Sequence, residues 1–251
     1  ALFSTDHSKP LNTLIGGLLY TKDHFLASRL KDSQARLPSL SKSRQSALLR
    51  RIMIETHYCN PSRYGRLALI DIYEIVRKRY FGRSKDFLDE DSGVEEITSY
   101  PYPSKLPSFL AMIGLFEIAR WKDVKQQRKD LLRSLIKIVM ESNLSSVLPR
   151  CYTDPKLDIV PIRFALNWEY SDDVIKKIGS FLNDDWVWFR TPIIATNIPL
   201  ESFGYQKGNC PISEKIGPQM VNIPCNVSGQ FHKDLIARVE ESFPRTSPKD
   251  V

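Results

Sequence analysis

The sequence predicts a mixed α/β protein that is rich in helix and ends in a small α+β domain. Apolar residues recur at helical spacing through most of residues 38–145. At residues 160–166 apolar side chains alternate with others, which is the two-residue period of a strand. Near the start, a short apolar run follows Gly16 and Gly17, as a buried strand would follow a turn. The 251 residues are enough for one large domain or two small ones.

The first part of the chain is expected to alternate helices with turns. A strand at residues 18–21 precedes a helix that opens at Asp23, a residue type that caps helices well. Pro38 with the serines after it, and Asn60-Pro61, break the helical pattern. An acidic loop and a proline-rich connector at 99–108 end this part, because proline disfavours helix in the residue before it. The helices expected between these breaks cover about residues 23–31, 44–58 and 66–80.

A long helix with a bend near Trp121 is expected next, followed by the small domain. Strands are expected at 160–166, around Trp186 and Trp188, and at 220–223, and a short helix precedes the last of them. A further helix follows Ser171, and the final one follows Ser228. The apolar stripe of the long helix is expected to contain Phe109, Met112, Ile113, Phe116, Leu131, Leu135, Ile138 and Val139. The inward residues of the final helix are expected to be Leu235, Ile236, Val239 and Phe243.

The charge is basic overall and unevenly spread. The formal net charge is +7, and residues 31–85 carry thirteen Lys or Arg against four Asp or Glu. A basic region can bind nucleic acid, an anionic membrane or anionic metabolites, or form solvated helix faces. The sequence has no zinc-finger spacing, no aromatic RNA-binding motif and no long Lys/Arg block, so we expect neither nucleic acid nor a membrane as partner. No apolar run approaches the ~20 residues of a membrane span.

The four cysteines are too dispersed to form a metal site, and no histidine joins them at a zinc spacing. We therefore expect no metal and mostly structural, reduced thiols, which favours a cytoplasmic location. The first residues do not form a signal peptide, because Asp6, His7 and Lys9 interrupt any apolar core. Ala1 is not a natural translation start, so the chain is expected to be processed or to belong to something longer.

The residues with the most suggestive chemistry lie at the front, in "FSTDHSKPLNTLIGGLLYT" (3–21). A lysine is a nucleophile only when its amine is neutral and held in place. Lys9 follows a small polar run and precedes Pro10, so its loop can hold the side chain rigidly. Ser4 offers a hydroxyl that can donate to an anion, and Gly16-Gly17 permits a tight turn or a close backbone approach. Taken singly, each of these features is also typical of an ordinary surface loop.

Their order resembles the cofactor-lysine segment of the DegT/StrS-type sugar aminotransferases, which are pyridoxal-phosphate enzymes of the aspartate-aminotransferase fold. "AMIGLFEIARWKDVKQQRKDLL" (111–132) is similar to the family's A-x-I-G-L-x-Q-L-x-R helix, and "GNCPISEKIGPQMVNIPCN" (208–226) to its C-terminal helix and strand. The resemblance implies the C-terminal portion of a type I pyridoxal-phosphate-dependent transferase fold. It assigns residues 1–100 to the distal part of the cofactor-binding domain, with a helical insertion at about 39–98. Residues 101–145 then form the connecting helix, and 146–251 the small α+β domain.

The resemblance also implies an activity and its residues. Lys9 would hold pyridoxal 5'-phosphate as a Schiff base, and Ser4 would lie beside the cofactor phosphate. His7 is expected either to touch the cofactor or the lysine, or to be a structural or exposed histidine. The enzyme would be a homodimer that transfers an amino group, usually from glutamate, to a nucleotide-linked keto-sugar. Such reactions serve amino-sugar, lipopolysaccharide and other cell-surface polysaccharide biosynthesis.

Parts of the family pattern are missing from this chain. The phosphate-binding loop, the aromatic that stacks on the ring and the acid that pairs with the pyridine nitrogen precede the lysine in the family, so the sequence is expected to be the downstream part of such an enzyme. An asparagine that precedes the A-x-I-G-L helix in the family is absent, and Lys105 lies in that stretch.

Other readings remain open beside this one. Arg163 and Arg190 are candidates for binding a diphosphate, or for surface ion pairs. Trp186 and Trp188 fit a core strand better than a stacking platform, and His24, His57 and His232 are expected to be structural or exposed. The whole chain is alternatively a non-catalytic, truncated relative that acts as an interaction module.

Overall fold

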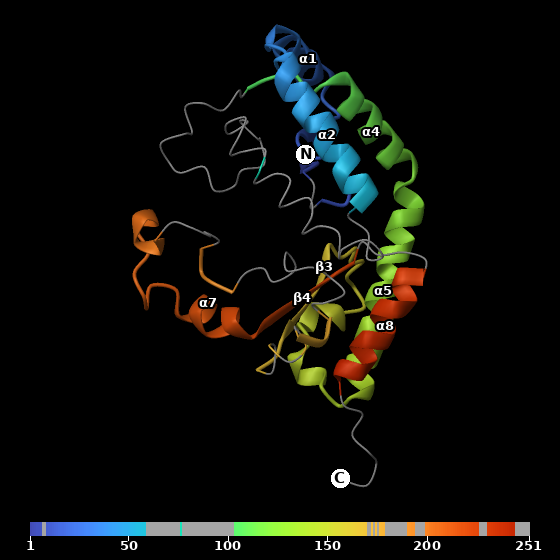
Figure 1. Cartoon of the computed structure of the whole chain (residues 1–251), viewed down its shortest axis with the longest axis vertical. Coiled ribbons are helices and arrows are strands. Elements are labelled where there is room, and N and C mark those ends of the chain that lie inside the picture. Colours follow the sequence, from blue (N-terminus) through green and yellow to red (C-terminus); the bar gives the residue numbers. More distant parts are fainter. Residues whose placement is uncertain are drawn as a thin grey trace. The chain divides into compact units, whose positions relative to one another are not determined.

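The computed structural model describes residues 1–6, 9–58, 76, 103–169, 172, 174, 176–178, 190–193, 199–225 and 230–243. This part of the chain is mixed α/β and rich in helix, as the sequence predicted (Figure 1). Its strands form two antiparallel sheets of two strands each. The chain divides into two compact units, Ala1–Trp121 and Lys122–Val251. Across the described ranges, no helix combines the length and apolar character that a membrane span needs.

The first unit begins with a β-hairpin. Strand β1 (Leu2–Ser4) pairs with β2 (Gly17–Leu19), in a register that places Leu2 opposite Leu19 and Ser4 opposite Gly17. The amino terminus closes the open end of the hairpin by donating to the Tyr20 carbonyl at 2.6 Å. Strand β2 overlaps the expected strand at 18–21, but the expectation that this strand is buried was wrong, because Leu19 and Tyr20 are exposed. The pattern did not predict β1, because three residues are too few to show an alternation.

Three helices of the first unit follow: α1 (His24–Arg36), α2 (Lys42–Tyr58) and α4 (Ser108–Ala119). Asp23 caps α1 as predicted, since its Oδ1 accepts from the Leu26 N–H at 3.0 Å. Helix α1 continues past the expected end near residue 31, because no breaker precedes Pro38. It buries none of its side chains, and Phe25 and Leu26 are exposed. This helix therefore contributes no fully buried side chain to a core.

The core of the first unit consists of Leu14, Ile15, Leu40, Leu48 and Leu110. Helix α4 contributes Leu110, with Phe109 and Ile113 packed partly against the cluster. The expectation that Met112 and Phe116 belong to the buried stripe was wrong, because both are largely exposed. Helix α4 is apolar on all sides, so its sequence pattern could not indicate which side is buried.

Two distant stretches of the first unit meet beside this core. The described end of the proline-rich connector, residues 103–107, runs next to the end of α1, and Ser39 and Lys105 form a parallel bridge. The Lys105 N–H donates to the Pro38 carbonyl at 2.9 Å. Residues 38–39 and 105, which are far apart in the sequence, are therefore neighbours within the first unit.

The second unit contains α5 (Trp121–Glu141) from Lys122 onward, α7 (Pro211–Ile216) and α8 (Gln230–Ser242). Its strands β3 (Arg163–Asn167) and β4 (Met220–Pro224) are antiparallel, with Phe164 opposite Ile223. Where a bend was expected, near Trp121, the helix is interrupted, because α4 ends at Ala119 and α5 begins at Trp121. Short 3-10 turns are Ser145–Val147, Arg150–Tyr152, Leu200–Phe203 and Gly217–Gln219.

The core of the second unit lies between the β3–β4 sheet, α5 and α8 (Figure 1). The predicted inward faces of both helices are confirmed: Leu131, Leu135, Ile138 and Val139 in α5, and Leu235 and Val239 with Phe243 just after α8. Two ring stacks extend this core, Tyr152 on Phe164 and Trp168 on Phe243, with centroids 5.2 and 4.6 Å apart. The buried Arg128 donates from Nη1 to the Pro161 carbonyl at 2.9 Å.

Several expected elements lie outside the described residues. The helix at 66–80 is described only at Val76, which is helical, and the acidic loop and the strand around Trp186 and Trp188 are not described. After Ser171, residues 172, 174 and 176–178 are helical as expected, and Val174 and Ile178 are buried.

Candidate functional site

The loop between β1 and β2 carries the predicted site residues. Ser4 ends β1 and is exposed, and its Oγ accepts from the Asp6 N–H at a long 3.5 Å. Lys9 is half-buried and closes a turn, because its N–H donates to the Asp6 carbonyl at 2.8 Å. His7 lies outside the described residues. The fold thus places an exposed hydroxyl and a partly sheltered amine on one short loop.

The base of this loop is closed by hydrogen bonds between its two sides. The Thr5 N–H donates to the Gly16 carbonyl at 3.1 Å, and the Thr13 N–H donates to the Thr5 carbonyl at 2.8 Å. The Thr13 hydroxyl lies 2.6 Å from the Thr5 hydroxyl and 2.7 Å from the Ile15 carbonyl. Both threonines are buried. We call this arrangement of Thr5, Thr13 and Ile15 the threonine clasp.

The backbone next to the clasp has an unusual conformation. Leu14 has φ of 70°, in the left-handed region that favours glycine. Its N–H donates to Asn12 Oδ1 at 2.7 Å, and its side chain is buried in the core of the first unit. A bulky residue keeps such a conformation only where its surroundings fix it. The loop is therefore held by side-chain packing as well as by hydrogen bonds.

Helix α4 approaches the clasp closely at Gly114. A Cβ atom on Gly114 would lie 3.1 Å from Thr13 Cγ2. On the other side of the loop, a Cβ on Gly16 would lie 2.9 Å from Leu106 Cδ1, and Gly16 has φ of 113°. The close backbone approach that the Gly16-Gly17 pair suggested is present at Gly17, where a Cβ would lie 3.1 Å from the Phe3 carbonyl oxygen. The lysine segment and the segment around Gly114, which the sequence resemblance had paired only by their order, are in contact.

Sequence reasoning missed the clasp. Thr5 and Thr13 are eight residues apart, and neither helical nor strand periodicity links that spacing to a shared hydrogen bond. Leu14 carried no signal at all, because nothing in a leucine indicates a left-handed conformation. The one usable signal was Gly16-Gly17, which marked where two parts of the backbone come close.

The other candidate residues lie apart from this loop in the sequence. Arg190 donates from Nη2 to Asp172 Oδ1 at 2.6 Å and to the Pro218 carbonyl at 3.4 Å, so it is engaged in the ion pair that was one of its two expected roles. Arg163 begins β3 and is half-buried, and its role in binding a diphosphate stays a prediction.

The histidines and acids indicate no metal centre in the residues that the structure describes. His24 begins α1 and is exposed, and His232 is half-buried in α8. The side chain of His57 is outside the described set. Among the described residues, no group of three or more His, Cys, Asp or Glu side chains has an arrangement suited to a metal ion.

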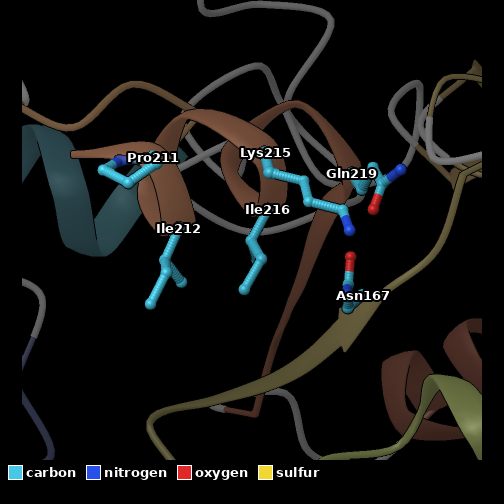
Figure 2. Close-up of a pocket in the computed structure, with 6 residues that line it drawn as sticks. All are labelled: Asn167, Pro211, Ile212, Lys215, Ile216 and Gln219. Carbon is cyan, nitrogen blue, oxygen red and sulfur yellow. The ribbon is translucent and has the colours of Figure 1, made fainter. Parts of the chain in front are cut away.

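A shallow pocket of about 480 Å3 lies in the second unit (Figure 2). The Ile212 and Ile216 side chains of α7 point the same way along one wall, and the Lys215 amine end points toward the Asn167 amide. Pro211 and Gln219 complete the lining. In the same helix, Glu214 accepts hydrogen bonds from the N–H groups of Gly208 and Cys210. The bond from Gly208 is the main reason that the pKa of Glu214 lies below its usual range.

Comparison of the chain with protein-family models, with curated proteins and with solved structures found no match.

Proposed function

We propose that this chain is the C-terminal portion of a pyridoxal-phosphate-dependent aminotransferase that transfers an amino group, with glutamate as donor, to a nucleotide-linked keto-sugar. The observation that supports the proposal best is the loop between β1 and β2. It holds Lys9 half-buried on a turn, Ser4 at the end of β1 and a closed base against α4. The contact between Gly114 and Thr13 adds support, because it joins two of the three segments on which the resemblance depends.

The donor set of this loop fits an aldehyde that carries a phosphate. The primary amine of Lys9 suits a carbonyl carbon, and the exposed hydroxyl of Ser4 suits a phosphate oxygen. Lys9 Nζ would hold the cofactor covalently, and Ser4 Oγ would donate to its phosphate. When bound, pyridoxal phosphate supplies an electron sink for charge that develops on the substrate carbon.

The chain's own part in the chemistry is proton transfer. A lysine amine released from a covalent bond is a base, and once protonated it is an acid, so Lys9 Nζ can carry a proton in both directions. This role requires that Nζ stay near the carbon from which the proton leaves. The closed base of the loop supplies that restraint, because both ends of the turn that carries Lys9 are tied to the same buried site.

The proposal is tested by covalent labelling of the lysine. The protein is mixed with pyridoxal 5'-phosphate and reduced with borohydride, and the modified peptides are identified by mass spectrometry. We expect the label on Lys9 and its loss in Lys9→Ala. Lys22→Ala is the matched control, because Lys22 lies in the same unit but is exposed. Labelling of Lys22 and other exposed lysines at the rate of Lys9 would contradict the proposal.

A second candidate function is that of an interaction module without catalysis. The surface of the first unit favours it, because large apolar side chains are exposed on both the hairpin and α4. The exposed set consists of Leu2, Phe3, Leu19 and Tyr20 in the hairpin and Met112, Leu115 and Phe116 in α4. Exposed apolar patches and unpaired strand edges mark surfaces that bind other proteins.

This second function and the proposed homodimer share one test. Sedimentation velocity over a range of concentrations measures self-association. We expect Leu115→Glu to weaken the association, since it places a charge on an apolar surface. Lys122→Glu, in the second unit, is the control for a change of charge alone. Association without labelling of Lys9 would favour the interaction module over the enzyme.

A further inference from the structure

The threonine clasp contains more hydrogen-bonding groups than the backbone of the loop requires. The Thr13 N–H already ties the two sides of the loop together through the Thr5 carbonyl at 2.8 Å. The Thr13 hydroxyl adds contacts to the Thr5 hydroxyl, at 2.6 Å, and to the Ile15 carbonyl, at 2.7 Å. All of these groups belong to buried residues. A buried polar group that loses its partner is costly, so this small network resists opening.

The protons of the clasp can be counted. Each hydroxyl has one proton to donate and two lone pairs to accept with. The Thr13 hydroxyl is the donor, and three acceptors lie within its reach: the Thr5 hydroxyl at 2.6 Å, the Ile15 carbonyl at 2.7 Å and the Thr5 carbonyl at 3.1 Å. This arrangement gathers residues 5, 13 and 15 around one donor. It spans Leu14, whose φ of 70° is unfavourable for a leucine.

We propose that Thr13 is a positioning residue for Lys9. Its hydroxyl restrains the base of the loop at residues 5, 13 and 15, next to the bond from the Lys9 N–H to the Asp6 carbonyl. The backbone bonds tie residue 5 to residues 13 and 16, and the Thr13 hydroxyl adds a contact to the Ile15 carbonyl between them. This inference deepens the proposed function. It rests on the proposed function only in the labelling experiment, which uses pyridoxal phosphate. The restraint on the loop itself exists without any cofactor.

The first experiment measures that restraint directly in the full chain without cofactor. Amide hydrogen exchange, followed by NMR, reports how often the Lys9 N–H leaves the Asp6 carbonyl. Thr13→Val keeps the shape of the side chain and removes the hydroxyl, and we expect Lys9 to exchange about tenfold faster. Thr13→Ser keeps the hydroxyl and should restore slow exchange. Thr21→Val is the matched control, because the Thr21 hydroxyl also accepts a hydrogen bond, from Asp23 N–H at 3.1 Å, outside this loop.

The amide of Leu110 separates positioning from plain stability. Leu110 lies in the core of the same unit. If Thr13→Val accelerates exchange at Lys9 and leaves Leu110 unchanged, the hydroxyl restrains the loop. If both amides accelerate by the same factor, Thr13 only stabilises the unit and the positioning role is overturned.

The second experiment asks whether the restraint matters for the amine. The ratio of pyridoxal-phosphate label on Lys9 to label on Lys22 is measured after borohydride reduction. We expect Thr13→Val to lower this ratio about tenfold, because the hydrogen bonds of the Thr13 hydroxyl are lost. Thr13→Ser keeps the hydroxyl and should restore the ratio. An unchanged ratio in Thr13→Val, with Lys9 labelled in the wild type, overturns the positioning role alone. If the wild type shows no label on Lys9, the proposed function fails, and the exchange experiment still decides the role of Thr13.

Discussion

At Leu14 the backbone conformation favours one residue type and the burial of the side chain favours another. Its φ of 70° favours glycine, whereas its buried side chain favours leucine. We expect Leu14→Ala to lower the free energy of unfolding by about 2–4 kcal/mol, through lost packing. Leu14→Gly should be less destabilising than Leu14→Ala by about 1 kcal/mol, because glycine relieves the backbone. Urea unfolding followed by circular dichroism measures both.

Leu110 provides the control for this comparison. It is equally buried but lies in the regular helix α4, where glycine is worse than alanine by about 1 kcal/mol. Leu110→Gly should therefore be the more damaging of its pair, which is the reverse of the order at Leu14. The same order at both positions would contradict the strained conformation of Leu14.

Among the residues that the structure describes, Cys225 has a strongly altered acidity. Burial raises the pKa of its thiol to about 12. In the unfolded chain the thiol ionises near its ordinary pKa of about 8.5, so above that pH the unfolded state gains stability and the folded state does not. We expect Cys225 to resist maleimide at pH 8 while the exposed Cys151 and Cys210 react, as read by mass spectrometry of the peptides. Labelling of all three at one rate in the folded protein would disprove this, and in urea all three should react.

At the residue scale, the sequence offered candidates for chemistry but not the local geometry. Lys9 and Ser4 were chosen because amines and hydroxyls have recognisable roles, and those roles stay predictions. Thr13 and Leu14 were missed, because a buried hydroxyl network and a left-handed leucine depend on tertiary contacts that no local pattern records.

At the element scale, the contact between α4 and the loop that carries Lys9 leaves little room for a side chain at Gly114. Alanine is a better helix former than glycine by about 1 kcal/mol, so Gly114→Ala would ordinarily stabilise a helix. Here the new Cβ would lie 3.1 Å from Thr13 Cγ2. The Thr13 side chain cannot rotate away without losing the hydrogen bond from its hydroxyl to the Ile15 carbonyl. We expect a net loss of about 1 kcal/mol or more in unfolding free energy, as overpacking commonly costs.

The double variant Gly114→Ala with Thr13→Ser tests this reasoning. Serine lacks the Cγ2 methyl group, so the close contact disappears while the hydroxyl stays. The double variant should recover the stability lost in Gly114→Ala, measured by the same unfolding curves. Equal losses with and without the methyl group would show that the contact with Thr13 is not the cause.

The elements that the sequence predicted well share one property. Helices α5 and α8 have an apolar side and a polar side, and strand β3 alternates, so their buried residues could be named in advance. Helix α4 is apolar on all sides and α1 has no fully buried side chain, so the spacing of apolar residues did not predict which side of either helix is buried. In such helices the buried side is decided by what packs there, which periodicity does not contain.

At the scale of the whole molecule, each unit has its own apolar cluster. Phe164 is fully buried in the second unit and stacks on Tyr152. We expect Phe164→Ala to cost about 3–5 kcal/mol, with the loss of amide protection greatest at Leu135 and Val239 in the same cluster. Hydrogen exchange measures this residue by residue. Leu110→Ala is the counterpart in the first unit, and its effect should be greatest at Leu48. A uniform loss across both clusters from either variant would contradict this assignment of the cores.

The bridge between Ser39 and Lys105 bears on how this polypeptide tolerates being cut. Ser39 and Lys105 lie beside the apolar cluster of the first unit. Leu40 and Leu48 of this cluster precede residues 59–102 in the sequence, and Leu110 follows them. A single nick between positions 59 and 102 would therefore leave each fragment holding its share of a common apolar cluster. Two separately expressed pieces, divided in that interval, should reassemble and co-elute as a non-covalent pair.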